Sequence, residues 1–402
     1  MRRGTDPAGR GTKARLFNVK YSPNLGDGLL AECLEAALKE HGADQAGTYS
    51  VDLGGRTSYA AGSSGRGHLL RALQVTPPAI RRSGMRFMLS LLARNRWRPH
   101  YRLHLDDADA IVVGGGNLFT DMDLNFPVKI SAALGLAAER GIPSAVYGVG
   151  VSAHWSNAGL DMMRRALAQA RPSYVSVRDD PSKANFDRLF AAAAGREAMV
   201  VRDPGLMISR YTALSGNTRP GERVGLCVTS AIALNYHSDR RVGDRDLEAW
   251  YLALAERLVR DGRKLSVFTN GSPEDDQFFA RIKGRFTAVT AGNCDFSLPS
   301  TPTELAQFIS GLSFLVAHRM HALIAAFSFG VPIFALEWDR KVNAFMASVG
   351  LADRTSWTSE AGIGMIAAAV ERDAGRVDER CGPVVQQAFA DVGGLAAALA
   401  RR

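Results

Sequence analysis

Short apolar runs that alternate with amphipathic helical stretches are the feature of this sequence that most limits its fold. In the first half, we expect strands at Arg15–Val19, Ser50–Leu53, Ala110–Val113, Ser144–Val149, Tyr174–Val177 and Met199–Val201. Helices are predicted between them at Asp27–His41, Asn125–Arg140, Ala158–Arg171 and Pro181–Ala194. This alternation is typical of a parallel sheet covered by helices.

The alternation restarts after a polar stretch, Ser215–Glu222, which is predicted to be an interdomain linker. Strands are then expected at Val224–Val228, Lys264–Phe268, Phe286–Val289, Phe314–Ala317 and Ile333–Leu336. The helices expected between and after them are Asp244–Arg260, Thr303–Gly311, His321–Phe329 and Val342–Val349. A chain of 402 residues is long enough for two domains. We therefore predict an α/β fold of two Rossmann-like domains, residues 14–215 and 222–358, that face a cleft.

Three segments fall outside this alternation. Residues 1–13 are basic and lack the apolar stretch of a secretory signal, so we expect a disordered tail. Residues 359–402 are rich in alanine and are predicted to form helices that pack back across a domain. Residues 54–105 are interpreted as an insertion in the first domain. Its run Arg81–Arg102 predicts either a basic amphipathic helix for a membrane surface or a helix that covers the sheet with solvated arginines.

Charge and cysteine content limit the partners and the compartment. Lys and Arg number 49 against 40 Asp and Glu, and the resulting formal charge of +9 favours anionic partners. An arginine-rich composition is also what a GC-rich genome would give. The four cysteines are scattered, without the spacing of a disulfide framework or a zinc site, and fit a reducing cytoplasm.

One apolar segment, Leu312–Phe334, resembles a membrane span in hydropathy alone. His318, Arg319 and His321 interrupt it midway, and charge at the centre of a span is costly. We expect a buried strand–helix–strand there and no transmembrane helix.

Two loops at predicted strand ends of the first domain offer polar groups to a ligand. The first contains Asn24, Gly26 and Asp27 and opens a helix, where an anion is attracted, although Asp27 could equally be a plain helix cap. The second, Gly114–Gly115–Gly116–Asn117, leaves backbone N–H groups uncovered for a phosphate or a carboxylate. The dinucleotide fingerprint needs a glycine where this chain has Phe119, so a nicotinamide or flavin role is disfavoured.

Cationic residues follow strands of both domains. Arg178 follows the first domain's fifth strand and either faces a ligand or pairs with Asp179 or Asp203. Arg319 and His321 open an apolar helix in the second domain, where they would cost solvation unless a cleft or an anion receives them. No carboxylate or cysteine lies next to the histidines to complete a metal site, so no metal is expected.

The ordered set of these motifs resembles the polysaccharide pyruvyltransferase family. It comprises Asn24–Leu25–Gly26–Asp27, Gly114–Gly115–Gly116, Arg178–Asp179, Asp203–Pro204, Arg319–Met320–His321, Gly330–Val331–Pro332 and Lys341. The resemblance covers about residues 15 to 350, and Trp338 stands where the family usually has tyrosine.

The resemblance implies a fold similar to the two-Rossmann (GT-B) glycosyltransferases. It also implies that phosphoenolpyruvate donates a pyruvyl group to a saccharide, as a ketal, with no cofactor. Arg319 would hold the donor's phosphate or carboxylate, His321 would be the acid or base, and Arg178 and Lys341 would bind the donor. The acceptor would be a cell-surface polysaccharide or its lipid-linked precursor, reached in the cytoplasm or at the inner face of the cytoplasmic membrane.

Two alternatives from other classes stay open. A nucleotide-sugar glycosyltransferase would share the fold and would need an acidic residue for ribose, for which Glu337 is the candidate. A nucleic-acid-binding protein is disfavoured, because no recognised binding motif appears and aromatic residues are not interleaved with the basic ones.

Overall fold

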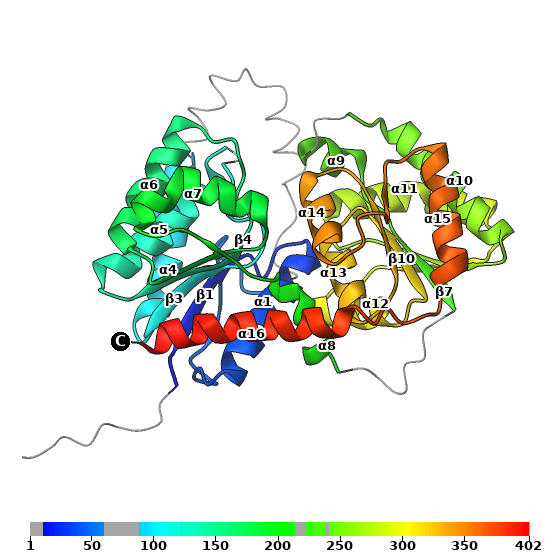
Figure 1. Cartoon of the computed structure of the whole chain (residues 1–402). Helices are drawn as coiled ribbons and strands as arrows, with labels where there is room; N and C mark the ends of the chain where they lie inside the picture. Colours follow the sequence, from blue (N-terminus) through cyan, green and yellow to red (C-terminus); the bar gives the residue numbers. More distant parts are fainter. Residues whose placement is uncertain (1–10, 60–87, 122, 214–221, 238–240, 402) are drawn as a thin grey trace, which may run out of the picture.

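The computed structural model describes residues 11–59, 88–121, 123–213, 222–237 and 241–401. Most of the predicted N-terminal tail, residues 60–87 of the predicted insertion and nearly all of the predicted linker lie outside this range. The exact limits of the two domains therefore stay a prediction. Within the described range, the chain forms two separate parallel sheets of six strands each (Figure 1).

The first sheet has the strand order β2-β1-β3-β4-β5-β6. Its strands are β1 (Ala14–Asn18), β2 (Tyr49–Asp52), β3 (Ala110–Gly114), β4 (Ser144–Val149), β5 (Tyr174–Val177) and β6 (Met199–Val200). The helices are α1 (Leu25–Glu40), the π-helical turn η1 (Ala93–Trp97), α4 (Arg98–Leu105), α5 (Asn125–Glu139), α6 (Asn157–Ala170) and α7 (Asp180–Ala194). The central strands β1, β3, β4 and β5 are wholly buried, as strands covered on both faces must be.

The second sheet has the strand order β12-β11-β10-β7-β8-β9. Its strands are β7 (Arg223–Cys227), β8 (Lys264–Phe268), β9 (Cys294–Ser297), β10 (Phe314–Ala317), β11 (Ile333–Leu336) and β12 (Thr355–Ser356). The helices are α9 (Ala231–His237), α10 (Asp244–Arg260), α11 (Pro273–Val289), α12 (Pro302–Ser310), α13 (Met320–Ser328), α14 (Arg340–Ser348) and α15 (Glu360–Asp373). Numbered within the domain, this is the Rossmann order 3-2-1-4-5-6, and the predicted two-domain α/β architecture is confirmed.

One predicted strand is wrong. The run Phe286–Val289 ends helix α11 instead, and the strand β9 begins five residues later, at Cys294. Phe278, Phe279, Ile282 and Phe286 are all buried, and Ile282 lies three and four residues from its neighbours Phe279 and Phe286. This spacing puts them on one face of a helix that packs on the sheet, so helical periodicity outweighs the strand preference of the last residues.

Connecting segments tie the two domains together. The turn η2 (Pro204–Met207) and helix α8 (Ile208–Tyr211) lead out of the first domain, and α1 packs against α12 and α13 of the second. Helix α16 (Cys381–Ala400) runs from the second domain to the first (Figure 1). There, Asp391 accepts a hydrogen bond from the Arg202 N–H (2.7 Å). The apolar core consequently continues from one domain into the other.

The described end of the predicted insertion covers the first domain. Trp97, Tyr101 and Leu105 are buried, and the Tyr101 hydroxyl donates to the Leu53 carbonyl (2.7 Å). Part of the predicted amphipathic run, residues 81–87, lies outside the described residues. None of the helices in the described ranges is long and apolar enough to cross a membrane.

Candidate active site

The strand orders indicate where a ligand would bind. In an open parallel sheet, a crevice forms where neighbouring strands send their crossovers to opposite faces. In the first sheet this point lies between β1 and β3, and in the second it lies between β7 and β10. The loops after these four strands carry most of the residues that the sequence nominated.

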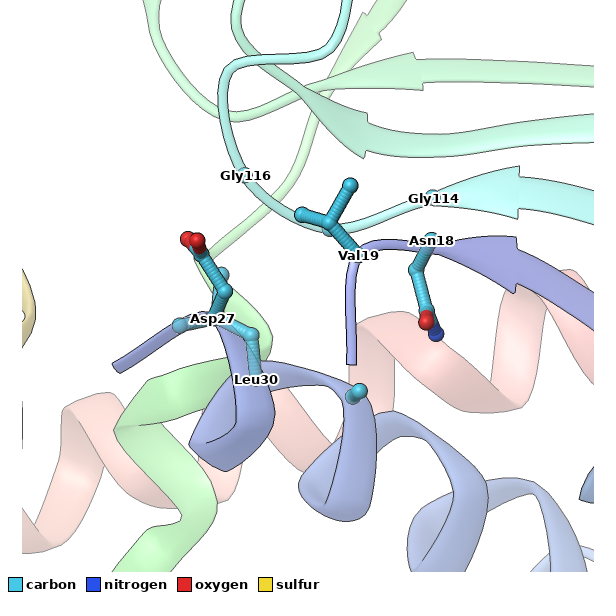
Figure 2. A pocket seen from close by; sticks show the side chains of 8 residues that line it. Asn18, Val19, Asp27, Leu30, Gly114 and Gly116 are labelled. Atoms are coloured by element: carbon cyan, nitrogen blue, oxygen red, sulfur yellow. The ribbon is translucent and has the colours of Figure 1, made fainter. Parts of the chain in front are cut away.

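A narrow pocket opens at the switch point of the first sheet (Figure 2). It is lined by Asn18, Val19, Asp27, Leu30, Ala31 and the three glycines 114–116. Gly115 and Gly116 have φ values of +82° and +77°, which side chains other than glycine rarely adopt. The Asp27 carboxylate points toward the turn at Gly116, where an added Cβ would lie 3.9 Å from Asp27 Oδ1 (Figure 2). The pocket thus combines glycine backbone and one carboxylate with the side chains of Asn18 and three apolar residues.

Asn117 and Arg178 lie side by side over Gly150. A Cβ added to Gly150 would lie 2.7 Å from Asn117 Oδ1 and 2.9 Å from Arg178 Nη2. The Arg178 side chain is only 4% exposed, and its Nε donates to Asp179 Oδ2 at 3.3 Å. Within the part of the chain that the structure describes, Asn117 Oδ1 and Arg178 Nη2 have no hydrogen-bond partner although both are buried. Arg178 therefore pairs with Asp179 and still has one buried nitrogen without a hydrogen-bond partner in the described part of the chain.

Asp203 adds an acidic group near this arginine. Its Oδ1 accepts the Gly205 N–H (3.0 Å), and its buried Oδ2 has no partner among the residues described. Burial raises the pKa of the Asp203 carboxyl, and the charge of Arg178 opposes that rise. Two carboxylates, those of Asp179 and Asp203, thus lie near Arg178.

On the opposite wall, Arg319 is already paired. It occupies the N-cap position of α13, where its side chain makes no capping bond within the described residues. Its Nε donates to Asp275 Oδ2 at 2.8 Å, and Nη2 contacts the same oxygen at 2.5 Å. Asp275 is fully buried and also accepts the Ser230 N–H (2.8 Å). This carboxylate joins three segments of the second domain and balances the charge of Arg319.

His321 lies in the first turn of α13 and is 11% exposed. Its Nδ1 is 3.6 Å from Asp27 Oδ1 of the first domain, and its buried Nε2 has no partner among the residues that the structure describes. Burial first, and then the charges of Arg178, Arg319 and Lys341, together lower the pKa of His321 to about 3. The ring is therefore neutral at pH 7, and all three cations act on it.

Lys341 completes the cationic set. It lies in the first turn of α14, 28% exposed, with Nζ 3.0 Å from Asp339 Oδ2. Burial and then the charge of Arg178 lower its pKa, while Asp339 opposes them. Two domains thus contribute cations to the surroundings of one histidine.

Asn24 and Gly26 shape the contact between the domains. Asn24 caps α1 by accepting the Gly26 N–H (3.3 Å), and its side chain also accepts a bond from Asn270 Nδ2. A Cβ on Gly26 would lie 2.3 Å from His321 Cβ, so only glycine allows this approach. Both residues join the walls of the cleft.

The structure thus brings the nominated residues together from both domains. Asn24, Gly26, Asp27, the three glycines, Asn117 and Arg178 form the first wall, and Arg319, His321 and Lys341 belong to the second. No group of three or more His, Cys, Asp or Glu side chains in the described ranges is arranged to hold a metal.

Comparison with known proteins assigns the family. The model of the polysaccharide pyruvyl transferase family matches residues 24–340. The chain belongs to the polysaccharide pyruvyl transferase family. The match covers all strands of the two sheets except β1 and β12, and it includes every predicted site residue except Lys341, which follows its last position. No curated protein matches the sequence.

Several solved structures of other proteins are similar in fold to this pyruvyl transferase family member. S. aureus MnaA in complex with UDP is similar at a TM-score of 0.52 and 11% identity, over 94% of this chain and 91% of that one. Anabaena Alr3699/HepE in complex with UDP is similar at a TM-score of 0.51 and 10% identity, over 96% of this chain and 98% of that one. A UDP-N-acetylglucosamine 2-epimerase is similar at a TM-score of 0.51 and 13% identity, over 96% of this chain and 95% of that one. At these identities the likeness shows the GT-B fold alone.

Two residues at the site of this pyruvyl transferase family member were not predicted from the sequence. Asp275, the partner of Arg319, is 44 residues away along the chain. Asn270 is fully buried at the end of β8, and its carbonyl accepts the Leu25 N–H across the cleft (3.0 Å). A strand-end position was the only available signal for Asn270. The acidic first turn of α11 was the signal for Asp275.

Proposed function

We propose that this protein transfers the pyruvyl group of phosphoenolpyruvate to two hydroxyls of a saccharide and forms a pyruvate ketal. The acceptor would be a cell-surface or exopolysaccharide unit, free or lipid-linked. The observation that carries the proposal is the buried Arg178 guanidinium. Its unpartnered nitrogen lies in a site with two more cations and a neutral histidine. Such a group costs free energy when empty and suits a small, multiply charged anion.

The chemistry matches the types of residue present. A proton adds to the methylene carbon of the enol phosphate, one saccharide hydroxyl attacks the neighbouring carbon, phosphate leaves, and a second hydroxyl closes the ring. Arg178, Lys341 and the remaining edge of Arg319 would bind the donor's phosphate and carboxylate. His321 would move the protons, and its neutral ring in the empty site first acts as an acceptor.

The pocket lined by Gly114, Gly115, Gly116 and Asp27 offers hydrogen-bonding groups to a saccharide acceptor. The pocket of Figure 2 exposes backbone at Gly115 and Gly116 and the carboxylate of Asp27, groups that hydrogen-bond to hydroxyls. It lies next to His321 through the contact of Asp27 with that ring. An acceptor placed there would have its hydroxyls within reach of the same histidine.

A test uses phosphate release. The purified chain would be incubated with phosphoenolpyruvate and a panel of saccharides, beside His321→Ala and a control, His154→Ala, on the exposed surface. We expect acceptor-dependent release by the unaltered chain and the control, and a loss of about 10²–10⁴-fold in His321→Ala. Equal release by a folded His321→Ala would contradict the role of this histidine.

The competing function is nucleotide-sugar transfer. It is supported by the fold, because MnaA and HepE were solved with UDP. Glu337, the candidate ribose ligand, is half-buried after β11, where its N–H donates to the Ser356 carbonyl (2.9 Å). Thermal shift separates the two functions, because a ligand that binds only the folded state raises its melting temperature. Stabilisation by phosphoenolpyruvate supports pyruvyl transfer, and stabilisation by UDP alone supports the alternative.

A cytoplasmic enzyme that touches the inner face of the membrane is part of the proposal. Arg94, Arg96 and Arg102 are exposed on η1 and α4, and Leu103 is 76% exposed beside them. Basic and apolar side chains together favour an anionic bilayer surface. Sedimentation with anionic liposomes at low salt should bring the chain down, and Arg94→Glu/Arg102→Glu should reduce the bound fraction. Equal binding of that variant would contradict this surface.

A further inference from the structure

Asp27 and His321 form a contact that neither domain contains alone. Asp27 lies in the first turn of α1, and His321 lies in the first turn of α13. The distance from Asp27 Oδ1 to His321 Nδ1 is 3.6 Å, slightly longer than a hydrogen bond. Gly26 permits this approach, since any Cβ there would overlap the histidine. Contacts of this kind commonly shorten when a substrate binds.

The two nitrogens of His321 have different surroundings. Nδ1 faces the Asp27 carboxylate, whereas Nε2 is buried without a partner in the described part of the chain. A carboxylate on one side of an imidazole fixes its orientation and stabilises its protonated form, which leaves the other nitrogen to transfer the proton. The geometry therefore assigns Nε2 to the reacting groups and Asp27 to positioning.

The charges around the pair control whether it holds a proton. Arg178, Arg319 and Lys341 act on His321, while Ser22, Arg56, Arg319 and Asp52 act on Asp27. Burial first, and the three cations second, lower the pKa of His321. Burial raises the pKa of Asp27 to about 6. At pH 7 the empty site thus holds a neutral ring beside a mostly ionised carboxylate.

We propose that binding of the donor anion loads the Asp27–His321 pair with one proton, which Nε2 then delivers to the methylene carbon. The inference rests on the proposed function. An anion placed among Arg178, Arg319 and Lys341 offsets the part of the pKa lowering of His321 that these three cations cause. The negative charge of Asp27 then stabilises the imidazolium at Nδ1. Donor binding and proton uptake become one event, so the acid is present only when there is a donor to protonate.

The protons balance over the cycle. The proton on Nε2 forms the new C–H bond, and the first hydroxyl returns a proton to Nε2 as its oxygen bonds to carbon. The C–O bond to phosphate breaks with its electron pair on the phosphate, and the second hydroxyl's proton leaves with that phosphate as the ring closes. When product and phosphate depart, the three cations again disfavour the imidazolium, and its proton returns to solvent.

Calorimetric titration with phosphoenolpyruvate at pH 7, in buffers of different ionisation enthalpy, counts the protons taken up. A phosphate ester has a second pKa of about 6 and is then mostly ionised, so it contributes little. We expect an uptake of several tenths of a proton by the unaltered chain. His321→Gln and Asp27→Asn should each lower it, and Asp161→Asn, on the exposed surface of α6, should not.

The outcomes separate the inference from the proposed function. Uptake near zero in the unaltered chain, or equal uptake in His321→Gln, overturns the proton-loading inference while donor binding stands. Failure of phosphoenolpyruvate to bind the unaltered chain overturns the proposed function itself. A structural role for Asp27 alone would change stability or affinity without changing the number of protons taken up.

Discussion

Arg178 follows β5 of the first sheet, and Arg319 follows β10 of the second, so the two arginines face one cleft from similar strand-end positions. Arg319 is held by two nitrogens on the buried Asp275. Arg178 makes one long bond to Asp179 and keeps a buried nitrogen without a partner in the described part of the chain. The comparison separates an arginine paired with a buried carboxylate from an arginine that keeps one buried nitrogen without a partner among the described residues.

The difference has opposite consequences for stability on the two walls. A buried pair costs a great deal to break from one side, because the remaining charge stays buried and uncompensated. A buried group without a full set of partners already costs free energy in the empty protein, and a ligand relieves it. We therefore expect that neutralising Asp275 on the second wall weakens the fold. Neutralising Asp27 on the first wall should strengthen it, because burial disfavours the charged form of that carboxyl.

The largest expected effect is that of Asp275→Asn. Removing this carboxylate leaves Arg319 without its partner, and the free energy of unfolding should fall by about 3–5 kcal/mol. Chemical denaturation measures the change. Glu256→Gln, which breaks the exposed pair with Arg260, is the matched control and should cost less than about 1 kcal/mol. An Asp275→Asn chain as stable as the original would show that Arg319 is not compensated as described.

Asp27→Asn should act in the opposite direction. The folded protein raises the Asp27 pKa from 3.8 to about 6, so the folded state loses stability relative to the unfolded chain as pH rises through this range. Asparagine removes that loss, and unfolding at pH 8 should require up to about 3 kcal/mol more free energy. Below pH 4 the gain should vanish. Melting curves across pH test this, with the exposed Asp161→Asn as control; a variant less stable at pH 8 would contradict it.

The smallest expected effect concerns the link between the two walls. Asn270→Ala removes the side-chain bond to Asn24 but keeps the bond from the Leu25 N–H to the backbone carbonyl at position 270. A net loss of about 1 kcal/mol is expected in the free energy of unfolding. Asn157→Ala, at an exposed position, serves as the control. A loss as large as that of Asp275→Asn would mean that the walls depend on each other more than their separate sheets suggest.

The fold followed from local pattern to a large extent. Buried strands such as Ala110–Gly114 and Phe314–Ala317 are continuous apolar runs between helical stretches, and their glycine- or arginine-bearing ends fixed the side of the sheet that faces the cleft. The run Phe286–Val289 misled because aromatic and branched residues also suit a helix face when the spacing is right. The strand preference of individual residues is a weak signal where packing against a sheet determines the secondary structure.

The sequence predicted which residue types would form the site, but it could not predict whether each of them is charged or neutral in the folded protein. From the sequence, His321 has only its reference pKa near 6.5 and could be an acid or a base. Its neutral state depends on burial and on three cations, of which Arg319 is two residues away and Arg178 lies in the other domain. The distinction between Arg178 and Arg319 likewise depends on Asp275, which only folding brings to the start of α13.

Titration of Arg178→Gln with phosphoenolpyruvate tests the central claim most directly, since the unpartnered nitrogen of this arginine is proposed to bind the donor. Arg165→Gln, on the exposed surface of α6, controls for the loss of one positive charge. We expect affinity to fall by about 100-fold in Arg178→Gln, the value of a charge-assisted contact of about 3 kcal/mol, and to stay near the original in the control. A folded Arg178→Gln chain that binds phosphoenolpyruvate as tightly as the original would contradict the account.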